Sequence, residues 1–165
     1  MGSSHSRREL LTHESVLLRS TGIPEDAVSV RDVYLDDPDG RQGVPVDPEN
    51  YIHEMRIKGK GENLPKMLML HGFMAGGAYF YKMFPFLWEK FDLIAIDTLG
   101  QGCSGRPQLS PDVFSDHAST VNFFVKSLER YLAVSSVVAP GEKFYLVAHS
   151  MGSIIASHFT LANPG

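Results

Sequence analysis

The sequence predicts an α/β domain with a mostly parallel sheet, and three observations support this prediction. Short apolar stretches at residues 66–70, 92–96 and 144–148 have the length and composition of strands that are covered on both faces. Longer stretches with helical periodicity lie between and after them. Two alternating segments precede them and add an antiparallel hairpin. The strand–helix alternation that follows the hairpin is typical of a parallel sheet.

The hairpin is expected in the first third of the chain. Residues 28–35 and 51–57 alternate between apolar and polar side chains, as half-buried strands do. Asp, Pro and Gly at residues 36–40 favour a turn, and residues 43–50 form a loop that contains proline. A second turn at residues 59–65 then leads into the first apolar strand.

Two helical segments are expected before the last strand. Residues 78–90 are rich in aromatic side chains, and Pro85 interrupts this segment or starts a new helical turn. The next helix begins at Ser115 or Asp116, since either side chain caps a helix N-terminus, and it runs to about Leu132.

The composition is that of one ordinary globular domain. The 165 residues are 43% hydrophobic and 21% charged, and the net charge is −4. This balance gives no electrostatic reason to expect a nucleic-acid partner. The single cysteine, Cys103, cannot form an internal disulfide, which fits a reducing compartment.

The N-terminal segment, residues 1–27, is expected to be a tail and a short helix that precede a partial domain of residues 28–165. Within it, the leucines of residues 9–20 fall near one helical face. Such a helix packs on the domain or rests on lipid, and the first outcome is the commoner one.

The first residues match a lipidation signal. Gly2 is followed by a hydroxyl residue at Ser6, as in N-myristoylation sites. A single acyl chain binds a membrane only weakly, and Arg7 and Arg8 would add the electrostatic attraction that it needs as a second signal. The alternatives are a disordered tail and the remnant of an expression tag.

The strongest functional signal is the junction around Ser150. The strand of residues 144–148 runs directly into this serine, and a helix of residues 151–162 follows. This is the setting of a nucleophile elbow, a tight turn that exposes Oγ at the positive end of a helix. Small residues flank such a serine: Gly152 fits, and Ala148 adds one methyl group to the usual glycine.

Backbone amides are expected to complement this serine in acyl transfer. The Met151 N–H would donate one hydrogen bond to the negative oxygen of the tetrahedral intermediate, and the Phe73 N–H the other, with Met74 as the alternative. Losing one such donor costs about 3–4 kcal/mol of barrier. The residues expected to line the substrate site beside them are His71, Gly72, Met74 and His149.

Residues 100–105 satisfy the G-x-G-x-x-G pattern of dinucleotide sites. That interpretation requires a helix to begin there and hold a pyrophosphate. Pro107 and Pro111 oppose a helix, so we expect a structural loop from Asp97 to Pro107 that closes the domain.

Together these residues resemble the α/β-hydrolase family. The matching pieces are LMLHGFMAGG, DTLGQGCSGRP and YLVAHSMGS, in the family's order, within residues 28–165. HGF followed by D-x-LG-x-G-x-S-x-RP looks like the lipid-acting abhydrolase branch. That branch includes N-acyl-phospholipid lipases, lysophosphatidic acid acyltransferases and lipase co-activators.

The resemblance also implies residues that this sequence does not contain. In the family an acid and then a histidine follow the serine, but the chain stops fifteen residues after Ser150. His71 lies in the expected oxyanion loop, where holding the loop's shape is its favoured role, and His117 and His158 are expected to face solvent or to pack on helices. Together with His149, these histidines offer no sequence reason to be the base. We therefore expect the N-terminal part of a hydrolase, truncated after the elbow helix, with little activity by itself.

The resemblance implies a serine hydrolase acting on carboxylic esters, with a lipid or another small hydrophobic ester as substrate. A non-catalytic co-activator and a lysophospholipid acyltransferase on the same fold remain alternatives. No cofactor is implied, and no metal, because the cysteine and the scattered histidines form no convincing ligand set. The expected location is cytoplasmic, with peripheral contact to membranes or lipid droplets left open.

Overall fold

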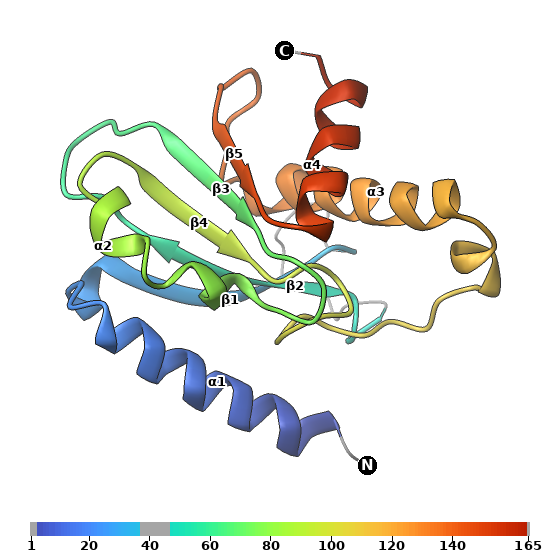
Figure 1. The fold of residues 1–165 in the computed structure, drawn as a ribbon, viewed down its shortest axis with the longest axis horizontal. Helices are drawn as coiled ribbons and strands as arrows, with labels where there is room; N and C mark the ends of the chain where they lie inside the picture. The colour runs from blue at the N-terminus through green and yellow to red at the C-terminus, as the bar shows by residue number, and fades with distance from the viewer. Residues whose placement is uncertain (1–2, 37–46, 165) are drawn as a thin grey trace.

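A computed structural model describes residues 3–36 and 47–164. Its sheet has five strands in the order β1-β2-β4-β3-β5 (Figure 1). β1 pairs with β2, and β2 with β4, in antiparallel fashion, whereas β3 is parallel to both β4 and β5. The antiparallel hairpin and the parallel strands predicted from the sequence are thus confirmed. The strands are β1 Val28–Tyr34, β2 Tyr51–Ile57, β3 Lys66–Leu70, β4 Asp92–Ile96 and β5 Tyr145–Ala148.

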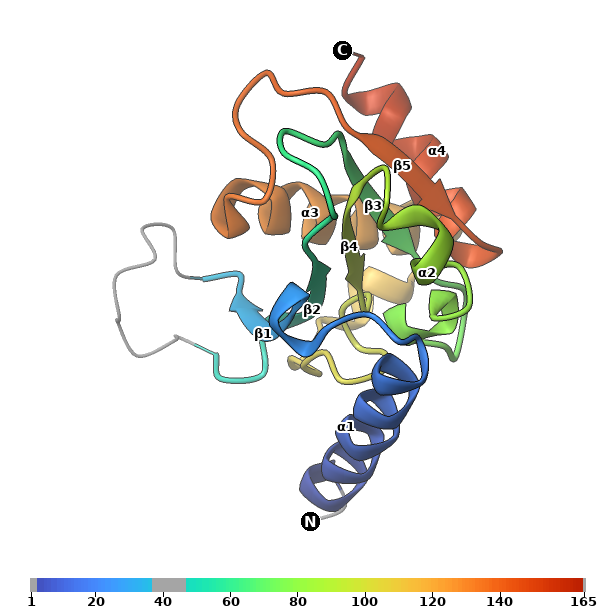
Figure 2. The same ribbon diagram turned by 90° about the vertical axis from the view of Figure 1, so that its left-hand side faces the viewer.

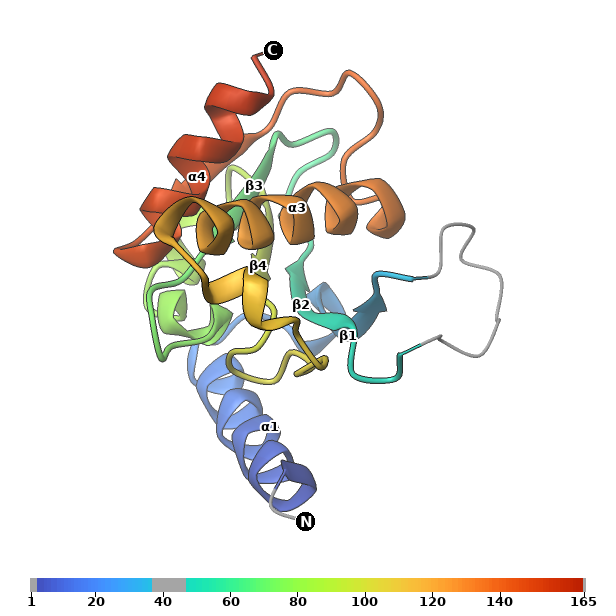
Figure 3. The same ribbon diagram turned by 90° about the vertical axis from the view of Figure 1, so that its right-hand side faces the viewer.

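Helices cover both faces of the sheet. α1 and α2 lie on one face and α3 and α4 on the other, as Figures 1, 2 and 3 all show. In the described part of the chain no helix combines the length and apolar character needed to cross a membrane. The helices are α1 Ser3–Ser20, α2 Phe84–Leu87, α3 His117–Ser135 and α4 Met151–Ala162, with short 3₁₀ turns η1 Glu25–Ala27, η2 Gly77–Phe80 and η3 Pro111–Phe114.

The two faces have separate hydrophobic cores because side chains alternate along a strand. In β3, Leu68 and Leu70 join the core beneath α3 and α4. Met67 and Met69 point the other way and join the core with Leu18 of α1 and the aromatic residues near α2. The continuous apolar pattern of β3 therefore reflects burial on both faces, as the sequence predicted.

One helical segment begins earlier than expected, and another is divided as expected. α1 begins at Ser3, six residues before the predicted start, and the predicted lipidation site Gly2 lies outside the described residues. The segment expected at residues 78–90 divides into η2 and the single turn of α2, which confirms the expectation that Pro85 starts a new helical turn. Pro85 stands at the start of α2, where its missing N–H costs no helical hydrogen bond.

α1 packs on the domain, which is the first of the two outcomes predicted for it. Leu18 is buried in the core of that face. An Arg7 guanidinium nitrogen lies 2.6 Å from an Asp32 carboxylate oxygen on β1. Glu14 reaches His53 on β2 with an oxygen–nitrogen distance of 3.1 Å. Polar contacts to two strands thus supplement the apolar packing of this helix.

A buried carboxylate joins the sheet to α3. Glu54 on β2 is fully buried, and one of its oxygens accepts a hydrogen bond of 2.8 Å from Arg31. Arg56 and the Tyr131 hydroxyl of α3 also donate to this carboxylate. Burial raises the pKa of Tyr131 well above its ordinary value, and the neighbouring Glu54 charge raises it further, so its hydroxyl remains a donor.

Candidate active site

The chain turns sharply between β5 and α4, and Ser150 occupies the turn. Its backbone has φ 53° and ψ −120°, and it stands immediately before the first residue of α4. A positive φ is uncommon for a residue with a side chain and stores strain of order 1–3 kcal/mol. The side chain is exposed to solvent. The sequence prediction of a serine on a tight strand-to-helix turn matches this backbone.

Gly152 allows α4 to approach the end of β3. A Cβ atom at this position would lie 2.6 Å from the carbonyl oxygens of both Leu70 and His71. Those backbone atoms cannot move without disturbing the sheet, so only glycine fits here. The small residue that the sequence pattern requires two positions after the serine therefore has a steric cause.

The loop that follows β3 lies against the serine turn. A Cβ at Gly72 would come within 3.0 Å of the Ser150 Cβ and 2.9 Å of the His149 Nδ1. The His149 amide also donates a 3.0 Å hydrogen bond to the Leu70 carbonyl. The structure thus brings together two segments that are about 80 residues apart and that the sequence assigned to one site.

The amides expected to bind an oxyanion occupy different environments. The Met74 amide donates a 2.7 Å hydrogen bond to the Gln101 side chain and is already engaged. In the described part of the chain the Phe73 amide makes no hydrogen bond to protein. Met151 is the first residue of α4, where an N–H has no partner within the helix. This pattern favours Phe73 over Met74 as the second donor.

His71 holds the loop rather than facing a substrate. Its side chain is fully buried, and its Nε2 accepts a 2.9 Å hydrogen bond from the Thr98 amide. Nδ1 therefore carries the proton and donates to the Gly72 carbonyl at 2.7 Å. These bonds agree with the loop-holding role expected for His71. The substrate contact also expected for this side chain does not agree with its burial, because both nitrogens already bind the backbone.

His149 is exposed and stacks on an aromatic ring. Its imidazole lies 4.8 Å from the Tyr79 ring centroid, with 25° between the planes. Phe73 and Met74 are also exposed, at 70% and 85% of their surfaces. Apolar side chains therefore surround the approach to the serine turn.

A cavity of about 890 Å³ lies between α1 and the segment after β3. Its lining includes Phe73 and Met74, which follow Gly72 in the loop beside the serine turn, but not Ser150 itself. Glu14, Asp97, Cys103 and Arg106 contribute polar groups to its wall. Its apolar lining includes Leu10, Leu17, Phe73, Met74, Ala78 and Tyr79.

Asp97 organises two glycine-containing loops, a role that sequence reasoning missed. Its buried carboxylate accepts hydrogen bonds from the amides of Gly77, at 2.5 Å, and Cys103, at 2.6 Å. A Cβ at Gly102 would lie 2.0 Å from one of its oxygens. The available signal was an aspartate directly after a buried strand, between two stretches rich in glycine.

Replacing Asp97 with asparagine is expected to destabilise the protein by about 1–3 kcal/mol, because an amide NH₂ would then face a buried backbone N–H. Urea denaturation of the variant measures this loss. The exposed Asp26→Asn change is the matched control and should leave the midpoint unchanged. Equal midpoints for the two variants would contradict the role given to Asp97.

The loop of residues 100–105 closes on itself rather than opening a helix. The Gly100 amide donates to the Gly105 carbonyl at 2.9 Å. The Arg106 guanidinium donates to the carbonyls of Ser104 and Gly102, both at 3.1 Å. The prediction of a structural loop is confirmed, and the dinucleotide interpretation lacks the helix it needs.

The remaining candidate acids and bases lie elsewhere. His117 and His158 are exposed, which is the first of the two roles expected for them. Asp116 caps α3 by accepting a 2.7 Å hydrogen bond from the Ser119 amide, which lowers the pKa of its carboxyl below the ordinary value.

Comparisons with known proteins show which protein family the chain is related to. The model of the alpha/beta hydrolase fold family matches residues 65–165. A 1-acylglycerol-3-phosphate O-acyltransferase of Arabidopsis thaliana is 31% identical over 114 residues, which are 69% of this chain and 25% of that protein. Lysophospholipase L2 of Escherichia coli is 37% identical over 75 residues, which are 46% of this chain and 22% of that protein. The chain therefore spans about a quarter of the length of these curated relatives.

Solved structures share the fold. A structure described as a membrane phospholipase A, a bacterial virulence factor, has a TM-score of 0.64 and 22% identity, covering 98% of this chain and 43% of that chain. Cfl2 from Burkholderia cenocepacia has a TM-score of 0.61 and 22% identity, covering 84% of this chain and 38% of that chain. At this level of identity the likeness describes the fold alone.

Proposed function

Because this chain belongs to the alpha/beta hydrolase fold family, we propose that Ser150 is the nucleophile of an enzyme that cleaves carboxylic esters of lipids. The observation that carries the proposal is the strained, exposed serine between a parallel strand and a helix N-terminus. Such a turn presents a hydroxyl for attack while keeping backbone amides beside it.

In the proposed reaction, Ser150 Oγ attacks the ester carbonyl carbon and forms a tetrahedral intermediate. The amides of Met151 and Phe73 donate hydrogen bonds to its negative oxygen. The intermediate collapses with loss of the alcohol, and water then releases the fatty acid from the acylated serine. The Oγ proton has to pass to a base, since a neutral hydroxyl is a weak nucleophile.

We assign that base to a histidine from a part of the whole protein that follows Ser150, as the order of the family's triad requires. Among the described residues, the histidines nearest in sequence to the site are engaged otherwise. His71 binds backbone through both ring nitrogens, and His149 stacks on Tyr79.

A lipid substrate is supported by the surroundings of the serine and by the relatives. Phe73, Met74 and Tyr79 are large, exposed and apolar in character, and side chains of this kind suit an acyl chain. Relatives that match this chain include a protein named lysophospholipase and others named acylglycerol-phosphate acyltransferases.

An acyltransferase reaction is the second candidate, because the named acyltransferases match this chain over more of its length than the lysophospholipase does. The acyl-serine would be the same in both reactions. Only the acceptor differs: water in hydrolysis, and the free hydroxyl of a lysophospholipid in transfer.

A fluorophosphonate probe tests the proposal on the protein expressed from its full reading frame. We expect one labelled serine, and peptide mass spectrometry should place the label on Ser150. Heat-denatured protein is the control and should not react. Folded protein that leaves the probe untouched would favour the non-catalytic alternative.

Product analysis then separates the two reactions. The protein is incubated with a phospholipid acyl donor, with and without lysophosphatidic acid. Release of free fatty acid in both samples supports hydrolysis. Conversion of the added lysophosphatidic acid into its diacylated form supports transfer.

A further inference from the structure

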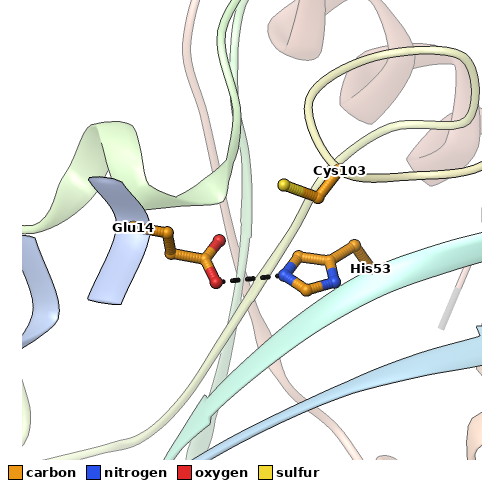
Figure 4. Close-up of side chains that lie close together, drawn as sticks. All are labelled: Glu14, His53 and Cys103. Carbon is orange, nitrogen blue, oxygen red and sulfur yellow. Dashed lines mark hydrogen bonds and ion pairs between the residues drawn. The ribbon is translucent and has the colours of Figure 1, made fainter. Parts of the chain in front are cut away.

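Three side chains of different chemistry converge between α1, β2 and the loop after β4 (Figure 4). Glu14 comes from the helix, His53 from the strand and Cys103 from the loop. A carboxylate oxygen, an imidazole nitrogen and the sulfur all lie within 4.8 Å of one another. The three residues are buried, with exposed fractions of 7%, 2% and 3%.

The imidazole of His53 is held in one orientation by its other nitrogen. Nδ1 lies 2.8 Å from an Asp32 carboxylate oxygen, and Asp32 is itself paired with Arg7 at 2.6 Å. Nε2 consequently points at Glu14, at 3.1 Å. Histidine metal ligands usually have such a carboxylate hydrogen-bonded to the ring nitrogen that does not bind the metal. The carboxylate fixes the ring orientation and makes Nε2 more basic.

We propose that Glu14, His53 and Cys103 form a binding site for a zinc-class divalent cation. One sulfur, one nitrogen and one oxygen donor suit a borderline-soft ion such as Zn²⁺. Glu14 and Cys103 also line the large cavity beside α1. That side gives the ion an entry path and leaves a fourth coordination position for water.

Charge balance is compatible with such an ion. Burial by itself lowers the pKa of His53, but its hydrogen bonds to Asp32 and Glu14 raise it to about 9. Burial raises the pKa of the Cys103 thiol to about 12. Both ring nitrogens of His53 face carboxylate oxygens, so coordination by Nε2 and by the Cys103 sulfur would release one proton from each group to solvent. One divalent ion replaces two positive charges, so the net charge of the cluster does not change.

The site would fasten α1 to the sheet and to the loop that begins at Asp97. Ser150 is not one of its residues, and no step of the proposed ester chemistry passes through it. Its test is therefore a binding measurement, and it stands or falls independently of the proposed function.

Cobalt substitution gives the most direct readout. We expect Co²⁺ to bind one-to-one and to produce a sulfur-to-metal charge-transfer band in the near ultraviolet, which only a thiolate ligand generates. Cys103→Ser should abolish this band and weaken Zn²⁺ binding by more than about 100-fold, beyond the range for losing an outer partner. The control, His158→Ala, removes an exposed histidine and should bind as the wild type does.

If Cys103→Ser fails to fold, X-ray absorption spectroscopy of the zinc-loaded wild type tests the site instead. It should show one sulfur at about 2.3 Å and nitrogen or oxygen ligands at about 2.0–2.1 Å. Cobalt binding without the charge-transfer band, a zinc shell without sulfur, or unchanged affinity in folded Cys103→Ser would overturn the site.

Discussion

Replacing Ser150 with alanine is expected to lower ester turnover by the whole protein about a million-fold, the loss seen when the nucleophile of a serine enzyme is removed. The variant retains the backbone amides of Met151 and Phe73 but has no atom that can form the acyl intermediate. Alanine accepts the positive φ of this turn no less readily than serine does, so the fold should be unaffected. The measurement is kcat/KM on a lysophospholipid.

The matched control is Ser153→Ala, which removes an exposed hydroxyl from the first turn of α4, three residues after Ser150. It should retain wild-type turnover and a wild-type unfolding midpoint. Ester turnover that survives in Ser150→Ala within tenfold of wild type would rule out this serine as the nucleophile. If the wild type, Ser150→Ala and Ser153→Ala all fold but none turns over the ester, the result would instead support the non-catalytic co-activator alternative.

Replacing Glu54 with alanine is expected to destabilise the fold by about 3 kcal/mol, because it removes a buried carboxylate that accepts hydrogen bonds from three side chains. The change leaves the Tyr131 hydroxyl buried without its acceptor. It also leaves Arg31 and Arg56 beside an empty space in place of their carboxylate. The midpoint of urea denaturation measures the effect.

Two further variants separate charge from packing. Glu54→Gln keeps an oxygen that accepts from Tyr131, so we expect a smaller loss than for alanine. Glu62→Ala removes an exposed glutamate and should change the free energy of unfolding by less than about 0.5 kcal/mol. A loss below about 1 kcal/mol for Glu54→Ala would mean that the carboxylate does not hold α3 to the sheet.

The strands were predictable because a buried strand requires a short run of apolar residues, which is visible in the local composition. The predicted bounds of β3, β4 and α4 agree with the structure to the residue. Apolar runs bounded by turn residues leave few alternatives for a chain that has to pair its backbone groups. The turn at Ser150 was predictable for a related reason: a strand runs into small residues and a helix, which restricts the backbone between them.

The aromatic segment after β3 was less predictable. Its apolar pattern fits a continuous helix, but Pro85 is disfavoured inside one, and it stands instead at the start of α2, apart from η2. His71 shows the same limit for a single side chain. Its position in the glycine loop allowed both a loop-holding role and a substrate contact, and the approach of Thr98 from the neighbouring strand end shows that the ring is used internally.

The sequence by itself determined the α/β alternation, the strand limits and the tight turn that presents Ser150, because these depend on residues adjacent in the chain. The tertiary structure alone decided that Asp97 would join two loops and that Glu14, His53 and Cys103 would meet. Periodicity indicates which face of an element is buried, but it does not indicate which element will cover that face. Glu14 and His53 are 39 residues apart, and they meet only because α1 folds back across the sheet.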